Sequence, residues 1–474
     1  MNGPIVRLFG LVVVLFGVLV AFTSRWTVFE AEALRTNEAN RRDELAEQRI
    51  RRGTIRSADG RVIARSARGA GGVYSRRYPT GELFGHPVGY SYTQLGRSGL
   101  EKEQSNELTG RSDELVTALG SLLGRRQEGS DIVTTLDSRA QRVALGALSG
   151  RKGAVVALDA KTGAVKAMAS SPGYDPNGLS DAATFKRLAN DNTARALVNR
   201  ATFDTFPPGS TFKVVTATAA LDSGRFEPST PVAGPAQKVV SGVPLNNFGN
   251  QDFGTIDLTT ALTKSVNTVW AEVGVRLGRR RMQEYMERFG FYDKPDLDYP
   301  RDQMLASGVR KRAGPRPVTS GSVDLGRVAI GQGDLQVTPL QMALVAATVA
   351  NGGVRMKPFL TQRVVDPDGR TTDRTRPEES ERVMSQGTAR KLTVMMRNVV
   401  AEGTGTAAAL TGVQVAGKTG TAEIDIPQRI NDPWFIGFAG DTAVAVVLDR
   451  VQGGQGGTIA APVAKQVLQA LGER

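Results

Sequence analysis

The longest apolar run lies close to the N-terminus. Residues 8–22 read LFGLVVVLFGVLVAF, with Arg7 before the run and Arg25 shortly after it. A bilayer span needs about 20 apolar residues, so the run is slightly short, and a cleaved signal peptide is the alternative. No convincing cleavage site follows the run, however. We therefore expect residues 1–24 to form a cytoplasmic tail and an uncleaved, single-pass transmembrane signal anchor in the cell membrane, with the rest of the chain extracytoplasmic.

Beyond the anchor, a charged pattern gives way to short alternating segments. Residues 25–52 are charged and helix-permissive, which is typical of a stalk. The segment Ile55–Ala64 predicts a β-hairpin that turns at Asp59-Gly60, since this dipeptide is a common hairpin turn. Helices are expected over 112–123 and 138–148, and a strand over 131–136. We interpret residues 25–150 as an elongated, mostly β pedestal or dimerisation-like module.

A second module begins near Gly153. Strand patterns cover 154–159 and 164–169 at its start, and they return near the C-terminus at 413–416, 434–439 and 442–448. Helical patterns lie between them at 259–273, 281–289 and 339–349, and a closing helix covers 460–471. Strands at both ends with helices between predict an α+β fold, in which the N- and C-terminal strands complete one antiparallel sheet flanked by helices. We assign residues 151–474 to this module.

Composition narrows the chemistry that the chain can perform. The 474 residues include no cysteine, which excludes a thiol nucleophile and cysteine-ligated metals, and one histidine, His86. This histidine lies far upstream of the motifs below, so it is a poor candidate for a Ser-His-Asp triad. The net charge of +13 comes from scattered basic runs, and aromatic residues make up only 6%. Such a pattern favours attraction to an anionic membrane or wall over nucleic-acid binding. We expect no cofactor and no metal.

The segment FPPGSTFK, Phe206–Lys213, carries the strongest functional signal. Ser210 and Lys213 are three residues apart and can share one face of a helix. The preceding Pro-Pro-Gly is a helix-start signal, and the N-terminus of a helix suits an attacking oxygen that becomes anionic. A partly desolvated, neutral Lys213 could take the serine proton. The pair is a candidate nucleophile and base that needs no histidine.

Two further motifs follow in order, Ser265-Val266-Asn267 and Lys418-Thr419-Gly420, the latter extended by Thr421. The first could simply be a capped helix start, and the second could be a turn. Beside Ser210, however, Asn267 offers a donor and an acceptor for a substrate amide, and Ser265 can relay a proton. Lys418 follows a strand, and Gly417 and Gly420 would let another backbone or a substrate approach closely.

Two of the three motifs occur a second time, in a context that favours a structural explanation. Ser149–Lys152 is a second S-x-x-K, but Gly150 and Gly153 interrupt any helix that would join the two side chains. Lys161-Thr162-Gly163 is a second K-T-G, and it stands where a hairpin must turn. We therefore expect neither of these copies to be functional.

The three motifs in this order resemble those of a class B penicillin-binding protein, a single-pass D,D-transpeptidase that cross-links peptidoglycan. The similarity extends over nearly the whole chain, and its size and domain order resemble the smaller actinobacterial-type members. The segments that carry it outside the motifs are Arg52–Ile55 with Asp59-Gly60, Gly99–Glu101, Gly331–Gly333, Thr338–Ala343 and Trp434–Phe438.

The resemblance implies roles for the motif residues. Ser210 would attack the penultimate D-Ala carbonyl of a stem peptide ending in D-Ala-D-Ala, Lys213 would act as the base, and Ser265 would shuttle the proton. Asn267 would hold the peptide amide. The K-T-G strand would face the terminal carboxylate through Lys418, Thr419, Gly420 and Thr421, and the backbone N–H groups of Ser210 and Thr421 would form an oxyanion hole. β-Lactams would act as inhibitors that leave Ser210 acylated.

Several alternatives stay open at this point. The motifs fit a D,D-carboxypeptidase as well as a transpeptidase, and a non-catalytic penicillin-binding scaffold or sensor is a third possibility. A Glu-x-x-Leu-Asn motif is missing, so rapid β-lactam hydrolysis is not expected. The resemblance also implies a polytopic glycosyltransferase partner of the SEDS type, by analogy alone.

Overall fold

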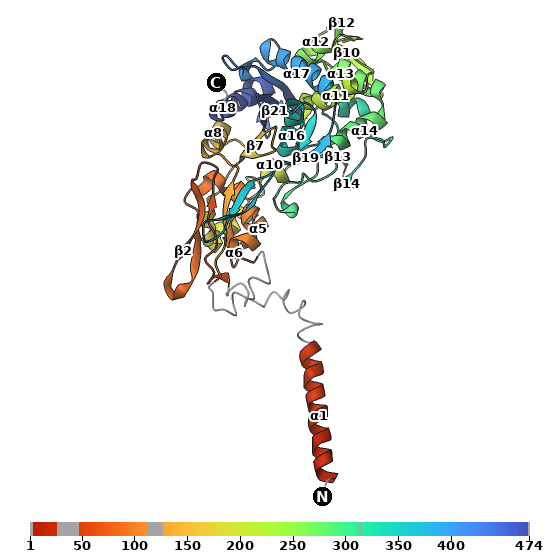
Figure 1. The fold of residues 1–474 in the computed structure, drawn as a ribbon. Coiled ribbons are helices and arrows are strands. Elements are labelled where there is room, and N and C mark those ends of the chain that lie inside the picture. Colours follow the sequence, from red (N-terminus) through yellow and green to blue (C-terminus); the bar gives the residue numbers. More distant parts are fainter. Residues whose placement is uncertain (1–2, 26–46, 112–126, 312–313, 473–474) are drawn as a thin grey trace.

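The computed structural model describes residues 3–25, 47–111, 127–311 and 314–472 (Figure 1). Its first element is the helix α1, Gly3–Ser24, whose side chains are all exposed or half-exposed. With 22 residues the helix is about 33 Å long, enough to cross the roughly 30 Å hydrocarbon core of a bilayer. The described part of the chain thus contains a helix fit to be a membrane anchor. Most of the expected stalk and the helix expected over 112–123 lie outside the described residues.

The N-terminal module is built on a six-stranded sheet. The expected hairpin is confirmed: β1 (Ile55–Arg56) and β2 (Val62–Arg68) run antiparallel, with Ile55 opposite Ala64 and Gly60 at a φ of +82° in the turn. The edge strand β3, Tyr74–Arg77, pairs with β2. On the other side of β1, the expected strand β6, Asp131–Thr134, pairs in parallel.

Two strands from much later in the chain complete this sheet. Strand β17, Thr361–Val365, runs antiparallel to β6, and β18, Thr371–Arg374, pairs with β17 to give the order β18-β17-β6-β1-β2-β3. In Figure 1 these cyan strands lie among the orange strands of the N-terminal module. The pedestal is therefore made from two separate stretches of sequence.

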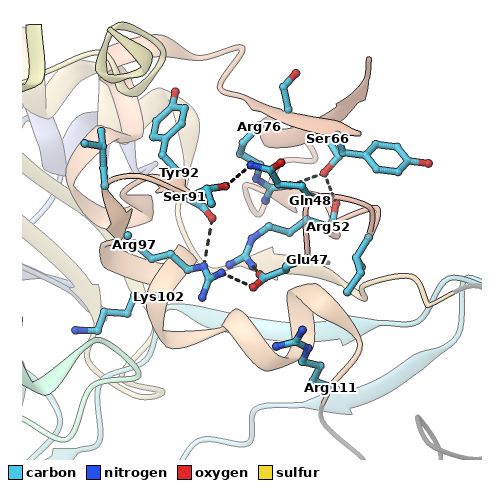
Figure 2. Close-up of a pocket in the computed structure, with 16 residues that line it drawn as sticks. Glu47, Gln48, Arg52, Ser66, Arg76, Ser91, Tyr92, Arg97, Lys102 and Arg111 are labelled. Atoms are coloured by element: carbon cyan, nitrogen blue, oxygen red, sulfur yellow. Dashed lines mark hydrogen bonds and ion pairs between the residues drawn. The ribbon is translucent and has the colours of Figure 1, made fainter. Parts of the chain in front are cut away.

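A buried ion cluster closes the N-terminal module. Glu101, on the short helix α5 (Gly99–Glu103), is fully buried and accepts hydrogen bonds from Arg52 Nε at 2.7 Å and Arg76 Nε at 2.6 Å. Arg52 also pairs with Glu47, which pairs in turn with Arg97. Figure 2 shows Glu47, Arg52, Arg76 and Arg97 of this cluster at the wall of a polar cavity of about 610 Å³. Through these ion pairs the cluster joins residues 47–52 to Arg97 and to Glu101 on α5, and Glu101 joins them to Arg76 on β3.

The C-terminal module contains the expected antiparallel sheet, in the order β20-β21-β22-β7-β8. Its strands from the start of the module are β7 (Gly153–Asp159) and β8 (Val165–Ser171), and those from its end are β20 (Val415–Asp425), β21 (Ile430–Ala439) and β22 (Thr442–Leu448). The two groups meet where Thr442 lies opposite Asp159. The α+β prediction is confirmed.

Alternate residues of the central strands point into two separate cores. Val155 packs with the helices α8 (Ser138–Leu148) and α18 (Ala461–Ala470), whereas Val156 packs with α16 (Pro339–Ala350). Figure 1 shows α8 and α18 on one side of β7 and α16 on the other. Because α8 packs on the C-terminal sheet, we propose a module boundary before Ser138 instead of one at residue 150.

Further helices surround the core that contains Val156 and α16. One of the expected helices has to be corrected. The helix expected over 259–273 is in fact two helices, α12 (Leu258–Thr263) and α13 (Asn267–Leu277). Ser265 breaks the helix because its φ is +62°, a left-handed value that no α-helix contains. Further helices of this module are α11 (Lys213–Asp222), α14 (Arg279–Arg288), close to the expected 281–289, and α17 (Gln386–Ala401), with the shorter α9 (Ala182–Asn190), α10 (Arg200–Phe203) and α15 (Leu325–Ala329).

Candidate active site

Ser210 lies in a tight turn just before α11. The sequence predicted one helix carrying both Ser210 and Lys213, but Gly209–Phe212 form a 3₁₀ turn, η5, and the α-helix begins at Lys213. Gly209 has a φ of +53° and donates its N–H to the Gly331 carbonyl at 2.9 Å. Ser210 is half-buried, and its hydroxyl forms no hydrogen bond among the described residues. The turn presents an uncommitted hydroxyl one residue after a glycine in the left-handed region, which glycine adopts readily.

Lys213 is buried and surrounded by oxygen atoms. Its Nζ donates to the Ser265 carbonyl at 2.8 Å and to Asn267 Oδ1 at 2.7 Å, and it lies 3.3 Å from Ser265 Oγ. Burial, followed by the positive charge of Lys418, holds the pKa of Lys213 well below its usual range. A neutral amine has two N–H groups, and two acceptor-only oxygens occupy both. Its lone pair is therefore left for a hydroxyl proton.

Ser265 and Asn267 reach Lys213 because the helical backbone is interrupted between α12 and α13. The left-handed backbone at Ser265, which typically costs about 1–3 kcal/mol, lets both its carbonyl and its hydroxyl contact Lys213 Nζ. Asn267 is the first residue of α13, and its Nδ2 donates to the Asn246 carbonyl at 3.1 Å. The strained residue and the helix start together turn three oxygens toward one amine.

Lys418, on the edge strand β20, also contacts Ser265. Its Nζ donates to Ser265 Oγ at 2.9 Å and to the Thr419 carbonyl at 3.0 Å. Burial lowers the pKa of Lys418 to about 7. Next to it, the hydroxyls of Thr419 and Thr404 are hydrogen-bonded at 2.6 Å, and the Thr421 hydroxyl accepts the Gly456 N–H at 3.2 Å. Ser265 Oγ thus lies between two lysines from distant motifs.

Strand β20 and the Ser210 turn are in direct backbone contact. A Cβ at Gly420 would lie 2.6 Å from the Pro208 carbonyl oxygen, and a Cβ at Gly209 would lie 3.0 Å from the Thr421 carbonyl carbon. The expected close approach at Gly420 is confirmed. At Gly417 the close neighbour is the ring of Phe435, which a Cβ would meet at 2.4 Å, so that glycine makes room for a core side chain.

The structure places the second copies of the motifs elsewhere, as expected. Ser149 is exposed and ends α8 in a left-handed conformation. Lys161 and Thr162 donate their N–H groups to Asp159 Oδ1 in the turn between β7 and β8. His86 is buried with its Nε2 2.8 Å from the Ala196 carbonyl oxygen, and burial lowers its pKa to about 4.

Sequence reasoning missed the residues that support the motifs. Thr404 and Gly456 contact the K-T-G strand, and the Asn246 carbonyl contacts Asn267, yet none of them belongs to a recognisable motif. Gly331 lies in the segment Gly331–Gly333 that resembles the family, and the sequence predicts no separate role for it. Among the described residues, no three His, Cys, Asp or Glu side chains gather as a metal site requires. The assembled groups are amines, hydroxyls and an amide, which suit acyl transfer through a serine.

Family models and relatives agree with this class of site. The model of the penicillin binding protein transpeptidase domain matches residues 153–469, and that of the penicillin binding protein A dimerisation domain matches residues 52–132. The chain belongs to the penicillin-binding protein transpeptidase family. It is 35% identical over 500 aligned positions to the peptidoglycan D,D-transpeptidase PbpA of Mycobacterium tuberculosis strain H37Rv, covering 99% of each chain. The same protein of Mycolicibacterium smegmatis is 34% identical, again with 99% of each chain covered.

Solved structures give the same result. Penicillin-binding protein A from M. tuberculosis, in its imipenem acyl-enzyme complex, superimposes with a TM-score of 0.80 at 32% identity, covering 90% of this chain and 99% of that one. The D,D-transpeptidase domain of a peptidoglycan glycosyltransferase from Eggerthella lenta gives a TM-score of 0.79 at 33% identity, covering 89% of this chain and 98% of that one.

Proposed function

We propose that this protein is a peptidoglycan D,D-transpeptidase that cross-links stem peptides through an acyl-enzyme on Ser210. The observation that carries the proposal is the environment of Lys213. Its buried Nζ has acceptor-only partners at 2.7 and 2.8 Å and lies beside a serine that also contacts Lys418. A neutral amine so placed is a general base in a protein whose one histidine lies elsewhere.

Acylation begins with recognition of a stem peptide that ends in D-Ala-D-Ala. The cation of Lys418 and the hydroxyls of Thr419 and Thr421 face the terminal carboxylate. Asn267 holds the peptide amide. The backbone N–H groups of Ser210 and Thr421 bind the oxyanion, and each such donor contributes about 3 kcal/mol to the transition state. The contact between Gly209 and the Thr421–Ala422 peptide supports this placement of the two N–H groups.

The covalent step transfers one acyl group. Ser210 Oγ attacks the penultimate D-Ala carbonyl while Lys213 takes the hydroxyl proton. The peptide C–N bond then breaks, Ser265 passes a proton to the leaving nitrogen, and D-Ala departs. An amine of a neighbouring stem attacks the ester, restores the Ser210 hydroxyl and leaves a new amide. The Ser265 Oγ contacts with both lysines, at 3.3 and 2.9 Å, support the proton relay. A β-lactam imitates the D-Ala-D-Ala amide, but its ester with Ser210 persists.

The proposal extends to the location of the reaction. The helix α1 is apolar enough to span a membrane, and we propose a single-pass anchor with the catalytic module on the extracytoplasmic side, where the wall is built. We further propose that the N-terminal module and the anchor meet a SEDS-type glycosyltransferase. A pedestal without any motif for glycan polymerisation supports the need for such a partner.

Product analysis tests the transpeptidase against its alternatives. Full-length protein in detergent is incubated with a stem pentapeptide with and without an added amine acceptor, and the products are separated by mass. We expect a transpeptidated product together with one released D-Ala. Hydrolysis alone with every acceptor would favour a D,D-carboxypeptidase. Acylation without turnover, together with normal wall growth in cells carrying Ser210→Ala, would favour a scaffold or sensor.

A further inference from the structure

The side-chain amide of Asn267 has to be held in one of its two orientations. Its Oδ1 faces Lys213 Nζ at 2.7 Å, and its Nδ2 donates to the Asn246 carbonyl at 3.1 Å. The carbonyl accepts only, so it selects the orientation in which the NH₂ group faces it and the oxygen faces Lys213. In the reverse orientation an N–H of Asn267 would bind the lone pair of Lys213 and compete with the serine proton.

The Asn246 carbonyl is itself held by the side chain of the next residue. Asn247 is 4% exposed, and its Nδ2 donates to the Pro235 carbonyl at 2.9 Å and the Gln251 carbonyl at 3.0 Å. Its Oδ1 accepts the Thr268 N–H at 3.0 Å and the Thr268 hydroxyl at 3.2 Å. The backbone N–H must meet an oxygen, so this side chain too has a single orientation. The one proton of the Thr268 hydroxyl is shared between Asn247 Oδ1 and the Pro235 carbonyl, which lies at 3.0 Å.

These contacts join a distant loop to the start of the helix that carries Asn267. Thr268 is the second residue of α13, whose first N–H groups have no partner within the helix. Val266, at the cap position, offers no side-chain hydrogen bond. Asn247 therefore caps α13 from outside its own sequence neighbourhood, and it ties the cap to the loop whose carbonyl orients Asn267.

We propose that Asn247 is a positioning residue of the acyl-transfer site: it caps α13 and fixes the Asn246 carbonyl, so that Asn267 presents an oxygen to Lys213. The inference rests on the proposed function, since it concerns the base of that reaction. It also gives a role to the loop 246–251, which no motif of the sequence marks. Without Asn247, the amide of Asn267 is free to rotate, and Lys213 loses a fixed acceptor.

The test is the second-order rate constant for acylation of full-length protein by a chromogenic β-lactam, measured across pH. For Asn247→Ala we expect a loss of roughly tenfold to a hundredfold, since small displacements of catalytic groups have effects of this size. We expect the acylation rate constant to rise with pH as Lys213 loses its proton. In Asn247→Ala this ascending limb should move to lower pH, because an oxygen acceptor stabilises the protonated amine of Lys213 and its loss favours the neutral form. Lys418, the charged group that contributes to the shift at Lys213, is unchanged in this variant.

The matched control is Gln237→Ala, which removes an exposed hydrogen bond to the Asn246 side chain; Gln237 lies on β10 (Gln237–Val240), which pairs with β11 (Val243–Asn246) just before Asn247. We expect it to match the wild type. If Asn247→Ala does not fold, Thr268→Val decides, because it conserves volume and removes one Asn247 contact; a smaller loss with the same direction of shift is expected. An unchanged rate, or a loss that is equal at every pH with the limb unmoved, would overturn the proposal. Failure of the wild type to acylate Ser210 would instead overturn the proposed function.

Discussion

At the scale of single residues, the site depends on two lysines that share Ser265 Oγ but differ in environment. Burial lowers the pKa of both, and the charge of Lys418 lowers the pKa of Lys213 further. We propose the order in which Lys213 loses its proton before Lys418, because a second positive charge acts on Lys213 in addition to burial. In that order Lys213 is the neutral amine that acts as a base, while Lys418 is still positive and binds a carboxylate.

This order predicts a bell-shaped pH profile for acylation by a carboxylate-bearing β-lactam. The rate constant should rise as Lys213 deprotonates and fall as Lys418 loses its charge, with the descending limb near pH 7 because burial lowers the pKa of Lys418 to about 7. Lys418→Arg should remove the descending limb, since a guanidinium stays protonated, at the cost of a lower plateau. The measurement is the acylation rate constant from acid to alkaline pH.

The control for that experiment comes from the second K-T-G motif. Lys161→Arg makes the same change in an exposed turn and should leave the profile as it is. A wild-type rate constant that stays level from neutral to strongly alkaline pH would contradict the assignment of Lys418 as the carboxylate-binding cation.

At the scale of elements, the Ser210 turn is braced from several directions. The Trp434 Nε1–H on β21 donates to the Pro207 carbonyl at 2.9 Å, and the Gly331 carbonyl accepts the Gly209 N–H. A Cβ at Gly331 would lie 1.8 Å from the Gly209 carbonyl oxygen. The geometry of the proposed nucleophile, Ser210, thus depends on segments far away in the sequence.

Gly331→Ala should therefore displace the turn. We expect acylation of Ser210 to fall about a hundredfold or more, as for displacements of about 1 Å elsewhere, together with a loss of stability. Gly369→Ala is the matched control: its φ is +84° against +79° at Gly331, but no atom lies within 4 Å of the added Cβ. It should cost about 1–2 kcal/mol of stability, because a Cβ disfavours the left-handed region, and leave acylation unchanged. Equal rates in both variants would show that the bracing does not matter.

Local patterns predicted elements well where tertiary contacts did not intervene. The helix Ser138–Leu148 and the strand Thr442–Leu448 have the expected bounds, because amphipathic periodicity and β-branched residues agree with their packing. The break at Ser265 was missed, since contacts with two distant lysines hold its left-handed backbone. Sequence motifs named the residues that gather around Lys213, but they did not reveal Thr404, Asn247 or the 3₁₀ turn.

At the scale of the whole molecule, the N-terminal sheet is built from strands of both halves of the sequence. Strands β17 and β18 leave the C-terminal half to complete the N-terminal sheet, and the buried Glu101 cluster holds the other side of that sheet together. Sequence alone could not predict that β17 pairs with β6, because the two strands are more than two hundred residues apart and their pairing follows from the folded topology. For the same reason, the boundary before Ser138 is proposed from the packing of α8 and not from a break in the sequence pattern.

Glu101→Gln should destabilise the N-terminal module strongly. Two buried guanidinium groups would lose their shared carboxylate, which typically costs about 3–5 kcal/mol. Burial alone would raise the pKa of Glu101, but Arg76 and Arg52 lower it overall. The contribution of Glu101 is therefore complete above the unfolded pKa of about 4.3 and is lost as the pH falls through the lower folded value. Thermal unfolding at neutral and acid pH measures both effects.

The control is the exposed pair Arg51–Glu128, whose side chains are 58% and 38% exposed. Glu128→Gln should change stability by no more than about 1 kcal/mol. If Glu101→Gln and Glu128→Gln unfolded alike, the buried cluster would not be a determinant of the module's stability.

The central claim is that Ser210 is the nucleophile, and covalent labelling with a fluorescent penicillin tests it most directly. Full-length wild type, Ser210→Ala and Ser149→Ala are labelled in parallel, and the modified peptide is located by mass spectrometry. The account predicts one adduct on the wild type and on Ser149→Ala, and none on Ser210→Ala. Labelling of Ser210→Ala at the wild-type level would contradict it.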